Sequence, residues 1–337
     1  MTISRQIFEY DPVFAYRYVP NISVRVPFFS GGYLVRTNEQ GFRSNHDFIS
    51  KKTLGFRRVL LFGDSYTSGD GVSNGKRYGD LLEKMIPNLE VYNFGMPGTG
   101  TDQHYLIYQN AAQNIEHDVM VISVLVENIR RIVAKYKQFH DAEGEHHLYA
   151  KPYYRLEEVN GNESLVLHGV PPLRKLISPN DVSQKDVDTG GRFLNIRKVV
   201  KRLKLKEVTQ HVTRYNPLPQ YDKPDHPDWL LMKAILKSFI SHHPKPVLLF
   251  PIPLRQHIEK TCATSKYGLR FSELAKETSC IVHDPLKDLL QYSKEDRRGF
   301  SFDDDHPTPQ GHQSLAKSLV PVLERLLENA TKPPSNT

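Results

Sequence analysis

Four short stretches carry side chains that could act together on a carbonyl group. "GDSYTSGDG" presents Ser65, "NFGMPGTGT" is a glycine-rich turn, "VEN" ends in Asn128, and "DDDHPTP" places His306 after three acids. A serine nucleophile needs a base to take its proton, a carboxylate to orient that base, and donors to meet the oxyanion that forms. Together these residue types are what acyl transfer through a serine requires.

The first three stretches follow short apolar runs that are typical of buried strands. The runs lie at 58–63, 90–95 and 118–126, and amphipathic helical patterns at 76–86 and 102–115 separate them. Such alternation predicts a parallel sheet with helices on both faces. Sites in these sheets form beyond the carboxyl ends of the strands, so we expect the three stretches to meet there.

In this order the four blocks resemble those of the SGNH (GDSL-type) hydrolase family. The resemblance covers 58–106, 119–130 and 301–320, and "RTNEQGFRS" resembles the segment that precedes the catalytic domain in many bacterial members. It implies an α/β three-layer sandwich with a flavodoxin-like parallel sheet. It also implies hydrolysis of a carboxylic ester through an acyl-Ser65 intermediate, with no metal and no cofactor.

Carried over onto this sequence, the resemblance makes Ser65 the nucleophile and His306 the general base. It assigns the oxyanion hole to the backbone N–H groups of Ser65 and Gly98 and to the side-chain amide of Asn128. One block departs from the family pattern, because Val126-Glu127-Asn128-Ile129 stands where Gly-x-Asn-Asp is usual. The pocket beside Asn128 is therefore expected to differ from that of other members.

Two residues compete for the acid of the triad. Asp303 has the DxxH spacing that is usual in the family, whereas Asp304 has the DxH spacing that some polysaccharide-modifying relatives use. We take Asp303 as the preferred acid and Asp304 as the alternative.

The alternation of strands and helices breaks near residue 137 and resumes near 228, with a final helix expected over 309–328. We therefore divide the chain into a lead-in, two parts of one catalytic domain, an inserted cap or lid, and a disordered tail. Within the insertion, Asn160-Gly161 favours a tight turn between two strands in 153–169. The lead-in is 1–56, the catalytic domain is 57–136 together with 228–330, the inserted cap is 137–227, and the tail is 331–337.

The insertion also holds a basic run between Arg192 and Lys206, with apolar residues interleaved. Our hypothesis is that Lys198, Lys201 and Arg202 hold an anionic part of the substrate. The alternative is a solvated helix face, since charge runs are more often that.

By analogy with bacterial members that handle acylated carbohydrates, the expected substrate is an O-acyl ester, and first of all an acetyl ester, on a sugar or glycan. The alternatives are an O-acyltransferase, a lipid or thioester hydrolase, and a non-catalytic glycan-binding module.

The composition limits the classes of partner, of site and of cellular location that we expect. A net charge of +7 on 337 residues does not indicate nucleic-acid binding. Two cysteines form neither a disulfide framework nor a zinc site. No run is long and apolar enough for a transmembrane helix or a signal peptide, so we expect a cytoplasmic protein. The oligomeric state is left open.

Overall fold

The centre of the protein is a five-stranded parallel sheet. The computed structural model describes residues 7–28, 31–140, 146–170, 176–188, 215–241, 243–263 and 265–331. The strand order is β15-β14-β7-β5-β6, and every neighbouring pair is parallel. The strands are β5 (Arg57–Phe62), β6 (Leu89–Asn93), β7 (Val119–Leu125), β14 (Val247–Ile252) and β15 (Ile281–Val282).

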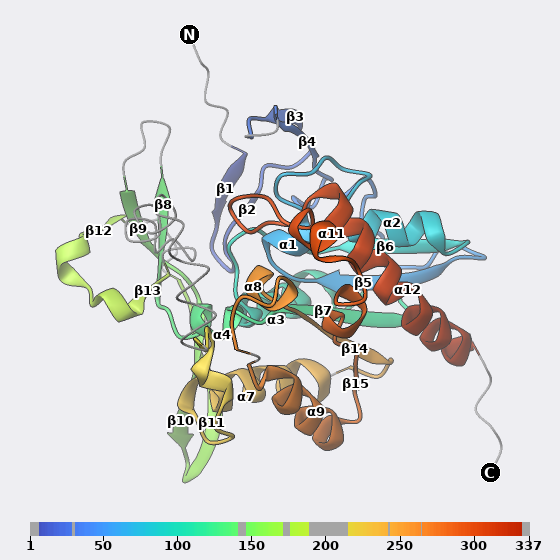
Figure 1. Cartoon of the computed structure of the whole chain (residues 1–337). Helices are drawn as coiled ribbons and strands as arrows, with labels where there is room; N and C mark the ends of the chain where they lie inside the picture. Colours follow the sequence, from blue (N-terminus) through green and yellow to red (C-terminus); the bar gives the residue numbers. More distant parts are fainter. Residues whose placement is uncertain are drawn as a thin grey trace.

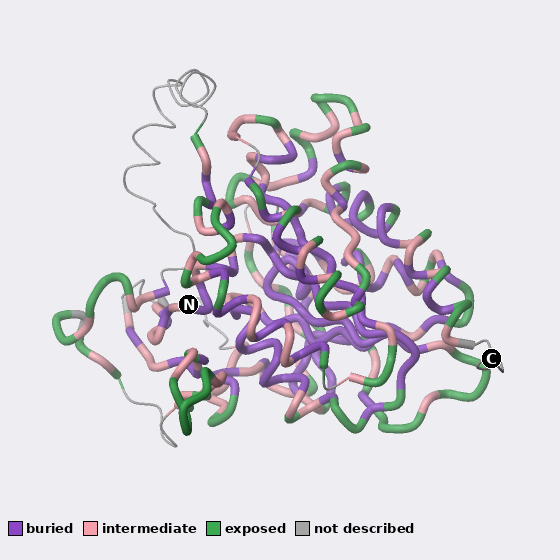
Figure 2. Tube along the Cα trace, turned by 90° about the horizontal axis from the view of Figure 1, so that it is seen from below, coloured by how far each residue is buried: buried purple, intermediate pink, exposed green. Residues whose placement is uncertain are grey.

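Helices cover both faces of this sheet, which confirms the predicted α/β sandwich (Figure 1). On one side α2 packs against α12, and on the other α7 packs against α3 and α9. All residues of β7 and β14 are buried, as strands between two helical layers must be, and Figure 2 shows this core as a purple centre. The helices are α2 (Tyr78–Met85), α3 (Thr101–Ile107), α7 (Pro227–Ser241), α9 (Tyr267–Thr278) and α12 (Pro309–Thr331).

The remaining helical elements are short. A π-helix, η1 (Tyr108–Ala112), continues α3, so the helix expected over 102–115 changes its hydrogen-bond pattern midway. The others are α1 (Ser65–Ser68), α4 (Asn128–Arg131), α8 (Arg255–Ile258), α10 (Leu286–Leu289), α11 (Lys294–Arg298), η2 (Pro179–Asp181), η3 (Gln184–Asp186) and η4 (Pro219–Tyr221).

The insertion lies between β7 and β14, which are neighbours in the sheet. It contains the predicted hairpin, β10 (Tyr153–Val159) with β11 (Asn162–His168), whose tip residues Asn160 and Gly161 both have positive φ. It also contains a four-stranded sheet that the sequence did not lead us to expect, because two of its strands have only two residues. Its order is β12-β9-β8-β13, from β8 (Tyr136–His140), β9 (His146–Ala150), β12 (Leu176–Ile177) and β13 (Val187–Asp188).

The lead-in consists of two β-hairpins that pack on the catalytic domain. Tyr16, Tyr18 and Phe42 belong to the main hydrophobic core, so this segment is part of the fold. The hairpins are β1 (Phe8–Asp11) with β2 (Ala15–Tyr18) and β3 (Ser23–Val26) with β4 (Tyr33–Arg36).

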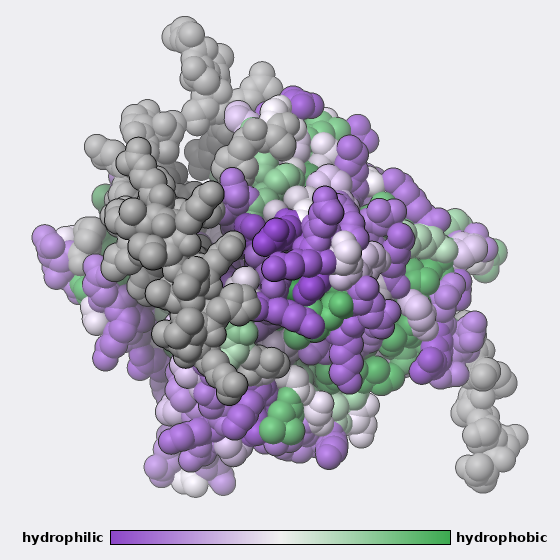
Figure 3. All heavy atoms as spheres, in the orientation of Figure 1, coloured by the Kyte–Doolittle hydropathy of each residue, from purple (hydrophilic) through white to green (hydrophobic). Residues whose placement is uncertain are grey.

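Hydrophilic residues occupy much of the described surface on the face shown in Figure 3, with smaller hydrophobic patches between them. Within the part of the chain that the structure describes, no helix has the length and apolar character needed to cross a bilayer.

Candidate active site

Ser65 lies at the point where β5 turns into α1. Asp64 is the N-cap residue of α1, and its side chain accepts a hydrogen bond from the Tyr66 N–H at 3.0 Å. Gly63 has no space for a side chain, because a Cβ there would lie 2.0 Å from Thr67 Oγ1. The close packing of this turn fixes Ser65 at the carboxyl edge of the sheet.

His306 reaches Ser65 from a loop that precedes α12. Its Nε2 lies 2.9 Å from Ser65 Oγ, and its Nδ1 lies 2.9 Å from Asp304 Oδ2. A serine, a histidine and a carboxylate are thus joined in one chain of hydrogen bonds. In this arrangement a neutral imidazole can accept the serine proton while the carboxylate holds the ring in place.

The acid beside His306 is Asp304, which corrects the preferred Asp303. The backbone explains the choice: Asp305 takes a left-handed conformation, with φ of 74°, so the chain folds back on itself. Asp304 then accepts both the backbone N–H of His306, at 3.3 Å, and the ring N–H. The charge of Asp303 contributes to the raised pKa of Arg255.

Carboxylates set the charge state of His306. Burial of the imidazole lowers its pKa, but the hydrogen bond that it donates to Asp304 and the negative charges of Asp70, Asp304 and Asp64 outweigh burial, so the pKa is raised. Burial raises the pKa of Asp304, and the contact with His306 outweighs it, so that pKa is lowered. The two shifts agree, since each group favours the charged form of the other.

Three hydrogen-bond donors without partners follow three adjacent strands. Among the described residues, the backbone N–H groups of Ser65, after β5, and Gly98, after β6, donate no hydrogen bond. The side chain of Asn128, after β7, is fully buried, and neither its nitrogen nor its oxygen has a partner there. Buried polar groups are normally paired, so unpaired donors at one edge of a sheet indicate a place for an oxyanion.

The altered third block retains this asparagine. Glu127, which stands beside it, forms an ion pair with Arg130 at 3.5 Å. Arg131, one turn further on, donates to Asp64 Oδ2 at 2.8 Å and to the Thr99 carbonyl at 3.3 Å. It thereby ties the loops after β5, β6 and β7 together.

The turn that contains Gly98 is held by further side chains. Lys137 Nζ donates to the Gly98 carbonyl at 2.6 Å and forms a buried ion pair with Asp188 at 2.8 Å. The Tyr16 hydroxyl donates to the Pro97 carbonyl at 2.5 Å. Gly98 itself has a φ of 70°, in the left-handed region that favours glycine.

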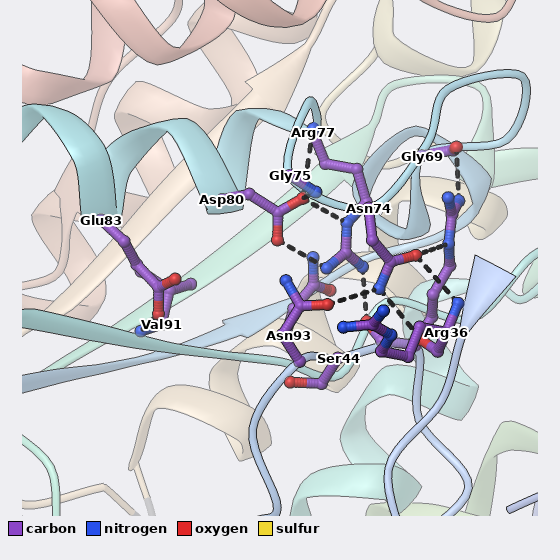
Figure 4. Close-up of polar contacts among 12 residues, drawn as sticks. Arg36, Ser44, Gly69, Asn74, Gly75, Arg77, Asp80, Glu83, Val91 and Asn93 are labelled. Carbon is purple, nitrogen blue, oxygen red and sulfur yellow. Dashed lines mark hydrogen bonds and ion pairs between the residues drawn. The ribbon is translucent and has the colours of Figure 1, made fainter. Parts of the chain in front are cut away.

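The lead-in also holds the far end of α1. The buried Arg43 donates to the carbonyls of Ser68 and Gly69 at 2.9 and 2.6 Å. Figure 4 shows the surrounding network, in which Arg77 forms an ion pair with Asp80 at 2.6 Å. Arginines that pair with backbone carbonyls in this way keep the short helix of Ser65 in a fixed position.

Tyr16, Asp70, Arg131 and Lys137 were not identified from the sequence. Asp70 stands in the "GDSYTSGDG" block but was given no role there. Tyr16, Arg131 and Lys137 stand outside the four blocks and reach the site through tertiary contacts. Lys198, Lys201 and Arg202 lie outside the described residues. Within the described part of the chain, no cluster of histidine, cysteine and acidic residues is arranged to hold a metal ion.

Comparison with known proteins identifies the family of this chain. The model of the GDSL-like lipase/acylhydrolase family matches residues 61–314. No curated protein matches the chain.

Several solved structures are similar to this one. A lipolytic protein of the G-D-S-L family from Veillonella parvula has a TM-score of 0.41 at 15% identity, and the match covers 80% of this chain and 99% of that one. A lipase/acylhydrolase from Enterococcus faecalis has a TM-score of 0.44 at 14% identity, covering 80% and 96%. A two-domain esterase active on acetylated mannans has a TM-score of 0.40 at 12% identity, covering 86% and 54%.

The family match spans most of the chain and includes Ser65 and His306. The protein therefore belongs to the GDSL-like lipase/acylhydrolase (SGNH) family and is a carboxylic ester hydrolase.

Proposed function

We propose that this esterase works through an acyl-Ser65 intermediate, with His306 as general base and Asp304 as the acid that orients it. The observation that carries the proposal is the continuous chain of hydrogen bonds from Ser65 through His306 to Asp304.

In the first half of the reaction, Ser65 Oγ attacks the ester carbonyl carbon and its proton passes to His306 Nε2. The N–H groups of Ser65 and Gly98 and the amide of Asn128 stabilise the oxyanion. Asp304 accepts the Nδ1–H bond and stabilises the imidazolium. The alcohol leaves with the proton from His306. Water then repeats the cycle on the acyl-enzyme and releases the carboxylic acid.

We further propose that the alcohol part of the substrate is a sugar or glycan and that the acyl group is small, such as acetyl. The site is rich in carboxylates: the charge of Asp70 acts on His306, and those of Asp305 and Glu127 act on the neighbouring Tyr66. Carboxylates accept hydrogen bonds from hydroxyl groups, which a sugar offers and an acyl chain lacks. The Tyr66 ring, 5.5 Å from that of His306, adds an aromatic surface.

The test compares wild type with Ser65→Ala and with Ser68→Ala, which removes another buried serine of the same helix. We expect Ser65→Ala to lose nearly all hydrolysis of p-nitrophenyl acetate and all labelling by a fluorophosphonate. Ser68→Ala should keep both. Substantial turnover by a folded Ser65→Ala variant would contradict the proposed mechanism.

The substrate class is tested separately, by acetate release from an acetylated oligosaccharide and by hydrolysis of p-nitrophenyl palmitate. We expect the acetylated sugar to be the better substrate. Preference for the palmitate ester would assign the protein to lipid hydrolysis. Transfer of the acetyl group to an added glycan in place of water would make it an acyltransferase that uses the same acyl-enzyme.

A further inference from the structure

Three consecutive carbonyl groups of the oxyanion turn are each bound by a side chain from a different segment. The Pro97 carbonyl accepts from Tyr16 of β2, the Gly98 carbonyl from Lys137 of β8, and the Thr99 carbonyl from Arg131 of α4. Tyr16 belongs to the lead-in, which lies outside the residues that the family model matches.

The contact of Tyr16 bears directly on the proposed oxyanion donor. The Gly98 N–H belongs to the same peptide unit as the Pro97 carbonyl. This unit is trans, since no cis peptide occurs in the described chain. In a trans peptide the C=O and N–H bonds lie in one plane and point in opposite directions. A hydroxyl that fixes the Pro97 carbonyl therefore also fixes the direction of the Gly98 N–H.

Tyr16 is well placed for this task. Its side chain is buried, and burial raises the pKa of its hydroxyl, which therefore keeps its proton and remains a donor. The adjoining turn is secured by a 2.9 Å hydrogen bond from Gln103, in α3, to the Phe14 carbonyl. Donation to a peptide carbonyl also polarises the N–H of the same peptide, because hydrogen bonds in a chain strengthen one another.

We propose that Tyr16 is a positioning residue of the oxyanion hole, and that the lead-in serves catalysis by holding the Pro97–Gly98 peptide in its working orientation. This rests on the proposed function, in which Gly98 is an oxyanion donor. Tyr16 acts through that peptide and has no part in proton transfer.

The chain offers a matched control. Tyr18 lies two residues further along β2 and is also buried, and its hydroxyl contacts Ser68 Oγ at 2.7 Å rather than the Pro97 carbonyl. Tyr16→Phe and Tyr18→Phe each remove one buried hydroxyl and keep the ring. Variants of Lys137 are less informative, since they also remove the cation that pairs with the buried carboxylate of Asp188.

For Tyr16→Phe we expect kcat and kcat/KM for p-nitrophenyl acetate to fall equally, by roughly 3- to 10-fold, with KM unchanged. A loss of this size is expected when one hydrogen bond that helps to stabilise the transition state is removed. The rate of fluorophosphonate labelling should fall by a similar factor, because the phosphonyl oxygen occupies the same hole. Tyr18→Phe should leave all three quantities near wild type, and thermal unfolding should show both variants destabilised to a similar extent.

Three results would overturn the positioning role: wild-type kcat in Tyr16→Phe, a rise in KM alone, or equal losses of kcat in both variants. The first would remove any effect on catalysis, the second would indicate contact with substrate, and the third a general loosening of the lead-in. If Ser65→Ala were inactive and Tyr16→Phe fully active, only this inference would fail. If Ser65→Ala remained active, the proposed function would fail and the inference with it.

Discussion

The two halves of the candidate site are built differently. In the loop from Gly299 to Thr308, which carries His306, backbone groups bond to one another, as in the 2.8 Å bond from the Phe302 N–H to the His306 carbonyl. Two side chains from other segments add to this, since Tyr66 donates to the Asp305 carbonyl and Arg255 to the Phe302 carbonyl. The side chains of His306 and Asp304 are 23% and 32% exposed. The turn around Gly98 differs, because buried side chains from the lead-in, the insertion and α4 donate hydrogen bonds to three consecutive carbonyls of the turn.

This difference indicates that the two halves of the site depend on different physical effects. The half that moves protons is controlled by nearby charges, which set the pKa of His306. The turn around Gly98 would bind the oxyanion through a backbone N–H, which does not titrate. Its contribution therefore depends on how rigidly that N–H is placed. Substitutions of the charged groups around His306 should therefore alter the pH dependence of activity. Substitutions in the turn around Gly98 should alter kcat at every pH.

The largest effect is expected from Asp304→Asn. This change keeps the size of the side chain but removes the charge that holds the His306 ring N–H and stabilises the imidazolium. We expect kcat to fall by roughly 10²–10⁴, measured at the optimum pH of each variant. Asp303→Asn is the matched control and should stay close to wild type. A greater loss in Asp303→Asn would return the triad acid to the DxxH position.

A smaller but still large loss of kcat is expected from Gly98→Ala. A methyl group there would lie 2.6 Å from Lys137 Nζ and 3.3 Å from Tyr16 Oη, so either the lysine or the turn must shift, and the φ of 70° is strained for any residue with a Cβ. We expect kcat to fall by roughly 10²–10³, the usual loss for one oxyanion donor, without a change in its pH profile. Gly55→Ala is the control, since its φ is also positive and no atom lies within 4 Å of the added methyl. Activity within threefold of wild type would contradict a role for this turn.

The smallest effect is expected from Asp70→Asn, and it should appear in the pH profile. The charge of Asp70 raises the pKa of His306, which must be neutral to act as a base. Its removal lowers that pKa, so the acidic limb of kcat/KM should move to lower pH while the plateau changes little. Glu158→Gln makes the same change in net charge at an exposed position of β10 and should leave the limb in place. An unmoved limb in Asp70→Asn would contradict the electrostatic account.

The catalytic sheet could be predicted because its signal is local. Residues 119–125 form a continuous run that is apolar except for Ser123, and such a run is typical of a strand buried on both faces. The Asn160-Gly161 hairpin was predictable for the same reason, since the turn residues lie next to the strands they join. The four-stranded sheet of the insertion was not, because strands as short as β12 and β13 have too few residues to show a pattern.

Only the site residues that stand in the motif blocks could be predicted from the sequence. Ser65, Gly98, Asn128 and His306 stand in recognisable blocks. The choice between Asp303 and Asp304 depends on the left-handed backbone of Asp305, which spacing alone does not reveal. Tyr16 escaped notice because its partner, Pro97, is 81 residues away, and such a pairing is decided by tertiary packing.

The hydrogen bond between Ser65 and His306 has a consequence for how the protein folds. It joins residues 241 positions apart in sequence, with the whole insertion between them. Contacts of such high sequence separation close a very long loop and form slowly compared with the local pairing of a hairpin. During synthesis Ser65 cannot meet its base until residue 306 has been made. Reactivity of Ser65 toward a fluorophosphonate should therefore report the completion of folding, and truncation before α12 should leave an unreactive serine.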